Sequence, residues 1–463
     1  MKSLTLATDP LPVAKGSLAF VSLGCPKNTV DSERMLGKLT ADGYALQADA
    51  DGADVVVINT CGFIEPARLE SLAVIREMLE LKKAGKIGSV IVAGCLAERN
   101  REQLLDEVPG VDQIVGVFGR DEIAAAVASA KARSRNLVEL DLFPPAPVRA
   151  LDDTARLRIT PRHFAYLKIS EGCDRLCTYC AIPQMRGKHA TKPIEEVVRE
   201  AKELIADGVR EINIVAQDST YYGMDLYGKV RLADLLKELN ALDGLEWIRV
   251  LYAYPEHVSD ELIDVLGNSK KIVPYIDIPL QHISDRMLRR MVRRVDRADT
   301  EALLGRLRKG IPNLTFRTTF IVGFPGETQQ DFDELKQFAA EFKFERAGVF
   351  PYSFEPTTPS AKLDGHLPEE VKMARRDELM ELQQTVAFEW ATKQIGKEMT
   401  VIVDGVDPEF ANHYRGRTAA DAPEIDCAIR VKGKNLRPGD FATVKVTAAD
   451  GYDLVGRTIG AAW

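Results

Sequence analysis

Long hydrophobic runs are missing from this sequence. No stretch of its 463 residues approaches the ~18 consecutive apolar residues that a membrane-spanning helix needs. The first residues, MKSLTLATDPLPVAKGS, also lack the continuous apolar core of a secretory signal. We therefore expect a cytoplasmic protein that does not bind a membrane.

Cysteine is scarce, and it is not spaced as in disulfide-rich proteins. The chain has seven cysteines, an odd number, without the dense spacing of small secreted domains. This pattern argues against a disulfide framework and favours thiols or metal ligands in a reducing compartment.

An excess of basic residues is missing as well. The formal net charge is -8 and the pI is about 5.5, which disfavours a nucleic-acid substrate while leaving a local basic groove open. The composition that is present, 45% hydrophobic and 28% charged, is typical of a well-cored globular protein. The length suits about three domains.

The first part of the chain alternates apolar runs with amphipathic segments. The runs are LAFVSL (18–23), DVVVIN (54–59), SVIVAG (89–94) and DQIVG (112–116). Strands that alternate with helices predict a parallel βα domain, which we place at 1–145. Prolines and polar residues then break the pattern, and we place a linker at 146–162.

The rest of the chain predicts two more domains. Six β-rich runs follow the linker: FAYLKIS, EINIVAQ, WIRVLYAYP, YIDIPLQ, TFRTTFIVGFPGE and RAGVFPYS. With the helical segments between them they predict a partial (βα)6 barrel over 163–395, which ends in a long helical pattern at 368–396. Short strands joined by turns over 396–463 predict a small β-barrel. The expected fold class is α/β with this C-terminal barrel.

The stretch EGCDRLCTYC places Cys173, Cys177 and Cys180 on the loop that leaves the first barrel strand, where such folds carry their active sites. Zinc would need a fourth ligand, and the nearest candidate, His189, lies beyond a proline-containing loop. A 4Fe-4S cluster on three thiolates instead leaves one iron open for a substrate or cofactor. We favour the cluster; a zinc knuckle or buried core cysteines are the alternatives.

The CxxxCxxC motif, with aromatic Tyr179 before its last cysteine, resembles the radical S-adenosylmethionine (SAM) superfamily. There the open iron binds the amino and carboxylate groups of SAM, and an electron from the cluster cleaves SAM to a 5'-deoxyadenosyl radical. The segment GFPGET, followed by a capping pattern at Thr328 and Asp331, resembles the SAM-binding turn of the superfamily. The turn residues implied to bind SAM are Gly323, Pro325 and Gly326.

Three earlier cysteines, Cys25, Cys61 and Cys95, each follow the carboxyl end of a successive predicted strand, with a glycine beside each. A single cysteine there is usually a small hydrophobic residue. Because adjacent parallel strands bring their ends together, the three jointly predict a second cluster site. Cys427 is isolated and is expected to be structural.

This combination resembles the methylthiotransferase family over nearly the whole chain, and the last module then corresponds to its TRAM domain. Members insert a methylthio group at an unactivated C–H bond, with one SAM as methyl donor and another as radical source. The auxiliary cluster takes part in sulfur delivery. The resemblance implies two 4Fe-4S clusters, SAM, and an electron donor such as flavodoxin or ferredoxin.

The family has two branches. MiaB-like enzymes modify a tRNA adenosine, and RimO-like enzymes modify the β carbon of an aspartate in the twelfth small-subunit ribosomal protein. SLGCPKNTVDSERMLG, NTCGFIEPARLESLAVI and GCDRLCTYCAIPQMRG resemble the RimO-like forms. One departure is HATKP, where the family commonly has a serine–arginine pair and where Lys192 would replace the arginine. The resemblance implies a ribosomal protein, free or in the assembled subunit, as substrate.

Further candidates lie at the cluster end of the predicted barrel. Gln217 and Asp218 are expected to bind the SAM amino group, and a turn cap is the alternative for Asp218. Arg186 and Lys188 are candidates for the SAM carboxylate or the substrate aspartate, with solvated loop charges as the alternative. Gln281 and His282, after YIDIPL, also point to this end. For His282, a structural histidine satisfied at a strand end is the more common case.

The C-terminal module is nearly neutral, with ten Asp and Glu against nine Lys and Arg over 396–463, a balance that suits phosphate binding poorly. We expect Asp404, Asp407 and Glu409 to lie near a basic ribosomal protein, with a solvated turn as the alternative. Two rival functions stay open. One is a tRNA adenosine methylthiotransferase, and the other is an iron–sulfur binding or electron-transfer protein.

Overall fold

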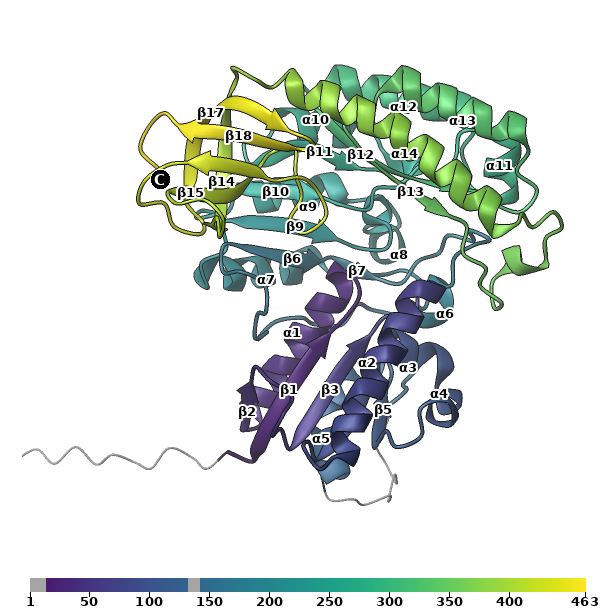
Figure 1. Ribbon diagram of the computed structural model, residues 1–463, viewed down its shortest axis with the longest axis vertical. Coiled ribbons are helices and arrows are strands. Elements are labelled where there is room, and N and C mark those ends of the chain that lie inside the picture. Colours follow the sequence, from purple (N-terminus) through teal and green to yellow (C-terminus); the bar gives the residue numbers. More distant parts are fainter. Residues whose placement is uncertain (1–13, 132–141) are drawn as a thin grey trace, which may run out of the picture. The chain divides into compact units, whose positions relative to one another are not determined.

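The computed structural model describes residues 14–131 and 142–463 (Figure 1). Residues 1–13, on which the expectation about a secretory signal rests, lie outside this range. The chain forms two compact units, one of residues 1–145 with 155–157 and one of 146–154 with 158–463. Within the described ranges, no helix combines the length and the apolar character needed to cross a bilayer.

The first unit contains a five-stranded parallel sheet in the order β2-β1-β3-β4-β5. Its strands are β1 (Gly16–Ser22), β2 (Tyr44–Gln47), β3 (Val55–Thr60), β4 (Ser89–Gly94) and β5 (Gln113–Val115). Every residue of β3 and β4 is buried, because helices cover both faces of the sheet. The sequence did not predict β2, which is short and partly exposed.

Helices of the first unit divide between the two faces of its sheet. They are α1 (Pro26–Ala41), α2 (Glu65–Lys83), α3 (Cys95–Asn100), α4 (Glu102–Glu107) and α5 (Ile123–Lys131), with the 3-10 turn η1 (Phe118–Glu122). Apolar residues of α1 and α5 pack in one core, and those of α2, α3 and α4 pack in another on the opposite face. The predicted parallel α/β architecture is confirmed.

The second unit contains six parallel strands in the order β13-β12-β11-β10-β9-β6, so each of the six predicted runs is a strand. They are β6 (Phe164–Lys168), β9 (Glu211–Val215), β10 (Trp247–Val250), β11 (Ile272–Asp277), β12 (Thr315–Val322) and β13 (Arg346–Pro351). Strands β6 and β13 form the two edges. The sheet is therefore a partial barrel.

Helices cover the outer face of this sheet (Figure 1). The longer ones are α7 (Ile194–Ala206), α9 (Leu232–Asn240), α10 (Asp260–Asn268), α12 (Arg297–Gly310), α13 (Gln329–Phe342) and α14 (Glu369–Thr392). Short helices and turns are α6 (Ile182–Arg186), α8 (Met224–Tyr227), α11 (Asp285–Arg290), η2 (Ser219–Tyr221), η3 (Pro255–His257) and η4 (Pro359–Lys362). The opposite, concave face carries buried polar side chains such as Lys168, Asn213 and Arg249.

The C-terminal segment closes into a five-stranded barrel in the order β14-β15-β16-β18-β17, as predicted. Its strands are β14 (Glu398–Val406), β15 (His413–Thr418), β16 (Ile429–Lys432), β17 (Phe441–Asp450) and β18 (Asp453–Thr458). Strand β15 was not predicted, because HYRGRT lacks an apolar run. Helix α14 leads directly into this barrel (Figure 1).

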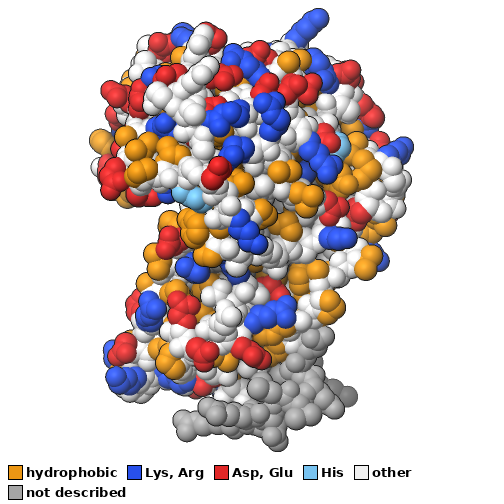
Figure 2. All heavy atoms as spheres, turned by 90° about the vertical axis from the view of Figure 1, so that its right-hand side faces the viewer, with side chains coloured by type: hydrophobic (Ala, Val, Ile, Leu, Met, Phe, Trp, Pro, Cys, Tyr) orange, Lys and Arg blue, Asp and Glu red, His pale blue; other side chains and the backbone are white. Residues whose placement is uncertain are grey.

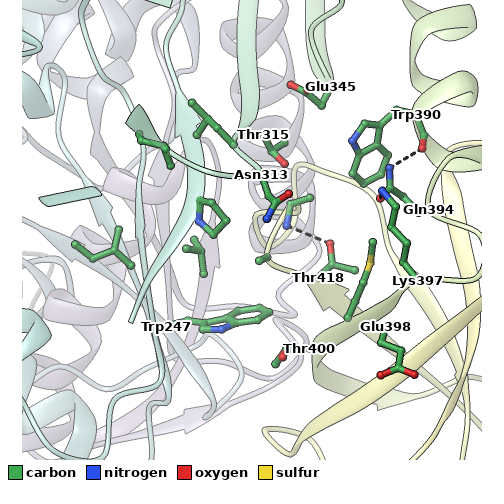
Figure 3. A pocket seen from close by; sticks show the side chains of 18 of the residues that line it. Trp247, Asn313, Thr315, Glu345, Trp390, Gln394, Lys397, Glu398, Thr400 and Thr418 are labelled. Atoms are coloured by element: carbon green, nitrogen blue, oxygen red, sulfur yellow. Dashed lines mark hydrogen bonds between the residues drawn. The ribbon is translucent and has the colours of Figure 1, made fainter. Parts of the chain in front are cut away.

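A cavity of about 610 Å³ lies between the C-terminal barrel and the amino ends of β10 to β13 (Figure 3). Trp247 of β10 and Thr315 of β12 line it from the sheet, and Thr400 and Thr418 of the barrel line it together with Trp390 of α14, which packs on the barrel core. Parallel βα folds carry their chemistry at the carboxyl ends of the strands. The cavity therefore belongs to the junction between sheet and barrel.

Candidate functional site

The loop with Cys173, Cys177 and Cys180 begins at the carboxyl end of β6. It is bracketed by β7 (Ser170–Glu171) and β8 (Ala190–Thr191), which pair in antiparallel fashion. Gly172 has a φ of 68°, and a Cβ there would lie 2.0 Å from the Lys188 carbonyl oxygen. Only glycine fits this entry to the loop.

The thiol groups of this loop sit in an environment that suits cluster ligands. The backbone N–H groups of Arg175 and Ile182 point at the sulfur atoms of Cys173 and Cys180, at 3.4 and 3.5 Å. Burial raises the pKa of both thiols to about 12. Because a metal ion stabilises the thiolate form, these buried thiols fit the role of metal ligands.

A site for a single metal ion has a different geometry. Within residues 14–131 and 142–463, no three His, Cys, Asp or Glu side chains converge as ligands of one ion do. In a cubane cluster each thiolate binds a different iron, so its ligands need not converge on one point. The residues of the loop fit a cluster.

Tyr179 links the cysteine loop to the GFPGET turn after β12. Its ring meets Phe324 of that turn edge-on, with centroids 6.3 Å apart, in an apolar cluster with Met287, Met291 and Tyr352. The structure thus brings the aromatic residue of the cysteine motif to the predicted SAM turn.

The GFPGET turn is held by hydrogen bonds to the carboxylates that follow it in the chain. Gly323 and Gly326 have φ values of 70° and 81°, and the Gly323 N–H donates to both carboxylate oxygens of Glu327, at 2.9 and 3.0 Å. Thr328 and Asp331 form the predicted capping box at the start of α13. The backbone of the turn is therefore fixed before any cofactor binds.

Asp218 and Gln217 differ in what they offer a cofactor. Asp218 accepts hydrogen bonds from Thr220 and the Tyr221 N–H, at 2.7 and 3.1 Å, and pairs with Arg175 at 2.9 Å. These bonds make it a turn cap, and its binding to the SAM amino group stays a prediction. Gln217 Nε2 donates to Glu171 at 3.1 Å, while its buried Oε1 has no partner among the described residues.

The basic candidates near the cysteine loop lie in different environments. Arg186 is buried and donates to Glu171 at 3.0 Å in an internal ion pair, and its binding to the SAM carboxylate or the substrate aspartate stays a prediction. Lys188 is exposed. Lys192 is buried between Asp153 and Glu200, at 2.8 and 2.7 Å, and so stabilises the fold.

Gln281 and His282 follow β11. His282 Nδ1 accepts the backbone N–H groups of Ile283 and Ser284, at 2.9 and 3.0 Å, so one ring nitrogen is satisfied. Its Nε2 is buried 3.5 Å from a Glu327 carboxylate oxygen and makes no hydrogen bond among the described residues. Gln281 is held at a φ of 71°, and its Oε1 is buried without a partner in the described part of the chain.

The three N-terminal cysteines lie at adjacent strand ends within the first unit. Cys25 caps α1, Cys61 follows β3, and Cys95 begins α3 directly after β4. A Cβ at Gly24 would lie 3.1 Å from the Cys61 Cβ, and one at Gly62 would lie 3.0 Å from the Cys95 carbonyl oxygen. The glycines thus allow the three ends to meet, in a geometry that fits a second cluster.

The expectation about the acidic residues of the C-terminal barrel is wrong for two of the three. Asp404 pairs with His163 and Arg417 at 2.8 and 2.9 Å, facing the parallel sheet. Asp407 is buried and accepts the N–H groups of Glu409 and Phe410. Only Glu409 is exposed, because hydrogen bonds and ion pairs hold the other two carboxylates.

Four exposed basic residues of the barrel, here called the basic patch, are Lys432, Lys434, Arg437 and Arg457. Lys434 and Arg437 line one surface hollow together with Asp440 and Thr458. Lys432 of β16 is the register partner of Arg457 of β18. A near-neutral module can therefore present a cationic face.

The face of the larger unit in Figure 2 carries hydrophobic side chains among charged side chains of both signs. Leu176, inside the cysteine loop, is 66% exposed. Sequence reasoning missed Arg175, which lies inside this loop, and two residues that the fold brings to it, Tyr254 and Arg293. No motif joins positions so far apart in the chain.

Three family models match the chain. The Radical SAM superfamily covers 167–339, the Uncharacterized protein family UPF0004 covers 17–116, and the TRAM domain covers 395–459. A ribosomal protein uS12 methylthiotransferase RimO from Lachnoclostridium phytofermentans is 46% identical over 438 residues, 94% of this chain and 98% of that protein. The RimO of Aquifex aeolicus is 45% identical over 441 residues, 95% of this chain and 96% of that protein.

The chain belongs to the RimO family of methylthiotransferases. A solved structure of TsrM, a radical SAM methyltransferase from Kitasatospora setae, superposes with a TM-score of 0.56 at 15% identity, covering 75% of this chain and 77% of that one. This likeness concerns the fold alone. Membership in a radical SAM family implies one 4Fe-4S cluster and SAM.

Proposed function

We propose that this chain inserts a methylthio group at the β carbon of an aspartate in ribosomal protein uS12. Family likeness over 94% of the chain carries the proposal. Two cysteine triads at the carboxyl ends of two parallel sheets support it, because the reaction needs both a radical source and a sulfur source. A protein with a single cluster would lack the second.

The residues of the larger unit have distinct parts in this proposal. Cys173, Cys177 and Cys180 hold the first cluster, which with bound SAM supplies one-electron cleavage of SAM. The Gln217 Oε1 accepts the SAM amino group, because it is a buried acceptor without a partner in the described residues. The backbone of Gly323, Pro325 and Gly326 lies against the cofactor, and Tyr179 packs the cysteine loop onto this turn.

The smaller unit holds the second cluster through Cys25, Cys61 and Cys95, and this cluster takes part in sulfur delivery. Glycine beside each cysteine lets the three strand ends approach one another closely. Cys427 takes no part, because it belongs to the C-terminal barrel.

The assembled small ribosomal subunit is the substrate form that the surface favours. The basic patch suits phosphate groups, which the subunit presents and the free protein does not. The reaction takes place in the cytoplasm, with a one-electron donor such as flavodoxin or ferredoxin.

The test incubates the anaerobically reconstituted enzyme with SAM, reductant and one of three substrates: assembled subunits, free uS12 or unmodified tRNA. Mass spectrometry of all three products is then compared. We expect a methylthio group on a uS12 aspartate, fastest in the assembled subunit. Modification of tRNA alone would assign the chain to the MiaB-like reaction, and no modified product together with stable clusters would favour an electron-transfer protein.

A further inference from the structure

Tyr254 contacts two cations, one from the cysteine loop and one from a distant turn. It lies just after β10 and is buried. The guanidinium carbons of Arg175 and Arg293 lie 4.1 and 4.2 Å from the centre of its ring. Arg175 sits between Cys173 and Cys177, whereas Arg293 comes from the turn after α11.

Besides Tyr254, three groups from other strand ends hold the Arg175 side chain. It donates to Asp218 at 2.9 Å, pairs with Glu256, and also contacts the Tyr221 ring at 5.1 Å. Its backbone N–H points at the Cys173 sulfur. A displacement of the Arg175 side chain would therefore move its own backbone N–H, which contacts the sulfur of Cys173.

Arg293, the second cation that contacts Tyr254, is buried. It donates to the Pro279 carbonyl at 2.6 Å. An arginine side chain keeps its charge in proteins, so Arg293 brings a positive charge into this buried site. The Arg294 N–H donates to the Tyr254 hydroxyl at 3.2 Å.

The turn before Arg293 is fastened to the cysteine loop. Thr178 donates its N–H to Met291 and its hydroxyl to Arg290, at 3.1 and 2.9 Å. Val292 in this turn has a φ of 55°, which is costly for a β-branched residue and persists only where surrounding contacts impose it. The loop and the turn thus form one fastened unit.

We propose that Tyr254 is a positioning residue for the first cluster. Its ring holds Arg175 and Arg293 in place, and these three residues form the Tyr254 clamp. The clamp fixes the backbone between Cys173 and Cys177, and it keeps two positive charges beside the cluster. This inference deepens the proposed function, since it rests on those cysteines holding a cluster.

The clamp has two measurable consequences. Loosening it opens the loop more often, so a chelator removes iron faster. Moving two cations away from the cluster lowers its reduction potential, because positive charge favours the reduced state. A residue that only stabilises the fold would not shift the potential.

The test compares Tyr254→Leu with Tyr254→Phe in the chain that also carries Ala at Cys25, Cys61 and Cys95, so that one cluster remains. Phe keeps the ring and removes only the hydroxyl. Tyr275→Leu is the matched control, because Tyr275 is also buried and stacked on an arginine, Arg249, at 4.5 Å, and bonds to Asp426 of the C-terminal barrel.

We expect Tyr254→Leu to release iron to a chelator about tenfold faster than the parent, in line with the loss of two cation–π contacts. An EPR-monitored titration should give it a more negative midpoint potential. Tyr254→Phe and Tyr275→Leu should stay within about twofold of the parent in release rate and keep its potential. Arg175→Gln, a milder change, should fall between them.

Parent-like release and potential in Tyr254→Leu would overturn the clamp, as would equal effects in Tyr275→Leu. If Tyr254→Leu fails to fold, Arg175→Gln decides by the same two measurements. Failure of the cluster assignment looks different, because the parent with the three alanines would then hold no cluster at all. Failure of the substrate assignment leaves both measurements on this cluster unchanged.

Discussion

Asp421 of the C-terminal barrel forms a buried ion pair with Arg346 at the start of β13. The Arg346 Nε and Nη2 atoms donate to the Asp421 carboxylate at 3.0 and 2.6 Å. Nearby, Tyr166 and Tyr275 donate to the carboxylates of Glu424 and Asp426, each at 2.7 Å. The barrel is therefore fixed to strands of the parallel sheet by a buried ion pair and by tyrosine–carboxylate hydrogen bonds.

Asp421→Asn should destabilise this junction by about 3 kcal/mol, because it leaves the buried Arg346 without its counter-charge. Urea unfolding followed by tryptophan fluorescence reports on the region directly, since Trp247 and Trp390 line the junction cavity. Glu409→Gln, at an exposed site, is the control and should unfold like the parent. Equal midpoints for the two variants would contradict the role of the pair.

The elements that could be predicted from the sequence are those with buried apolar runs. All six strands of the partial barrel were predicted, because helices cover their outer face and force an apolar pattern on them. Strands β2 and β15 were missed, since short strands at an edge or in a small barrel carry little such pattern. Strand-end cysteines could be predicted because chain order fixes where parallel strands end.

The parts of the site that the sequence could not give depend on pairing between distant residues. Asp404 and Asp407 look exposed in VDGVDPE, yet their partners His163 and Arg430 come from other segments. Arg186 resembles a loop charge, and only the fold shows Glu171 beside it. Charge pairing of this kind has no periodicity, so no local pattern predicts it.

Gln217→Leu should weaken SAM binding about tenfold, because it removes the one acceptor that the proposal assigns to the SAM ammonium. Calorimetric titration of the reconstituted enzyme with SAM measures this affinity. Gln184→Leu is the matched control, since Gln184 is exposed and donates to the Thr357 carbonyl. An affinity that is unchanged in Gln217→Leu would remove Gln217 from the cofactor site.

Cys427 should resist alkylation at pH 8 in the reconstituted enzyme. Burial raises its pKa to about 12, so the reactive thiolate appears only as the pH rises toward that value. Labelling by iodoacetamide, located by mass spectrometry, should increase roughly tenfold for each pH unit from 8 to 10. Rapid labelling of Cys427 at pH 8 would contradict this environment, and labelling of the other six cysteines would show that they are not ligated.

Alanine at Lys432, Lys434 and Arg437 should weaken binding of the assembled ribosomal subunit and reduce its salt dependence. Losing three phosphate contacts lowers the slope of log affinity against log salt by roughly two. Alanine at Lys202 and Lys309, both exposed on outer helices, is the control and should leave the slope unchanged. Equal slopes in both variants would exclude the basic patch from RNA contact.

The most direct test of the account is mass spectrometry of uS12 after reaction with the parent and with two triad variants, each with alanine at its three cysteines. We predict that the parent replaces one aspartate hydrogen by a methylthio group. The variant without Cys25, Cys61 and Cys95 should still form 5'-deoxyadenosine but give no methylthio product, and the variant without Cys173, Cys177 and Cys180 should form neither. Methylthiolated uS12 from the first variant would contradict the assignment of the N-terminal triad to sulfur insertion.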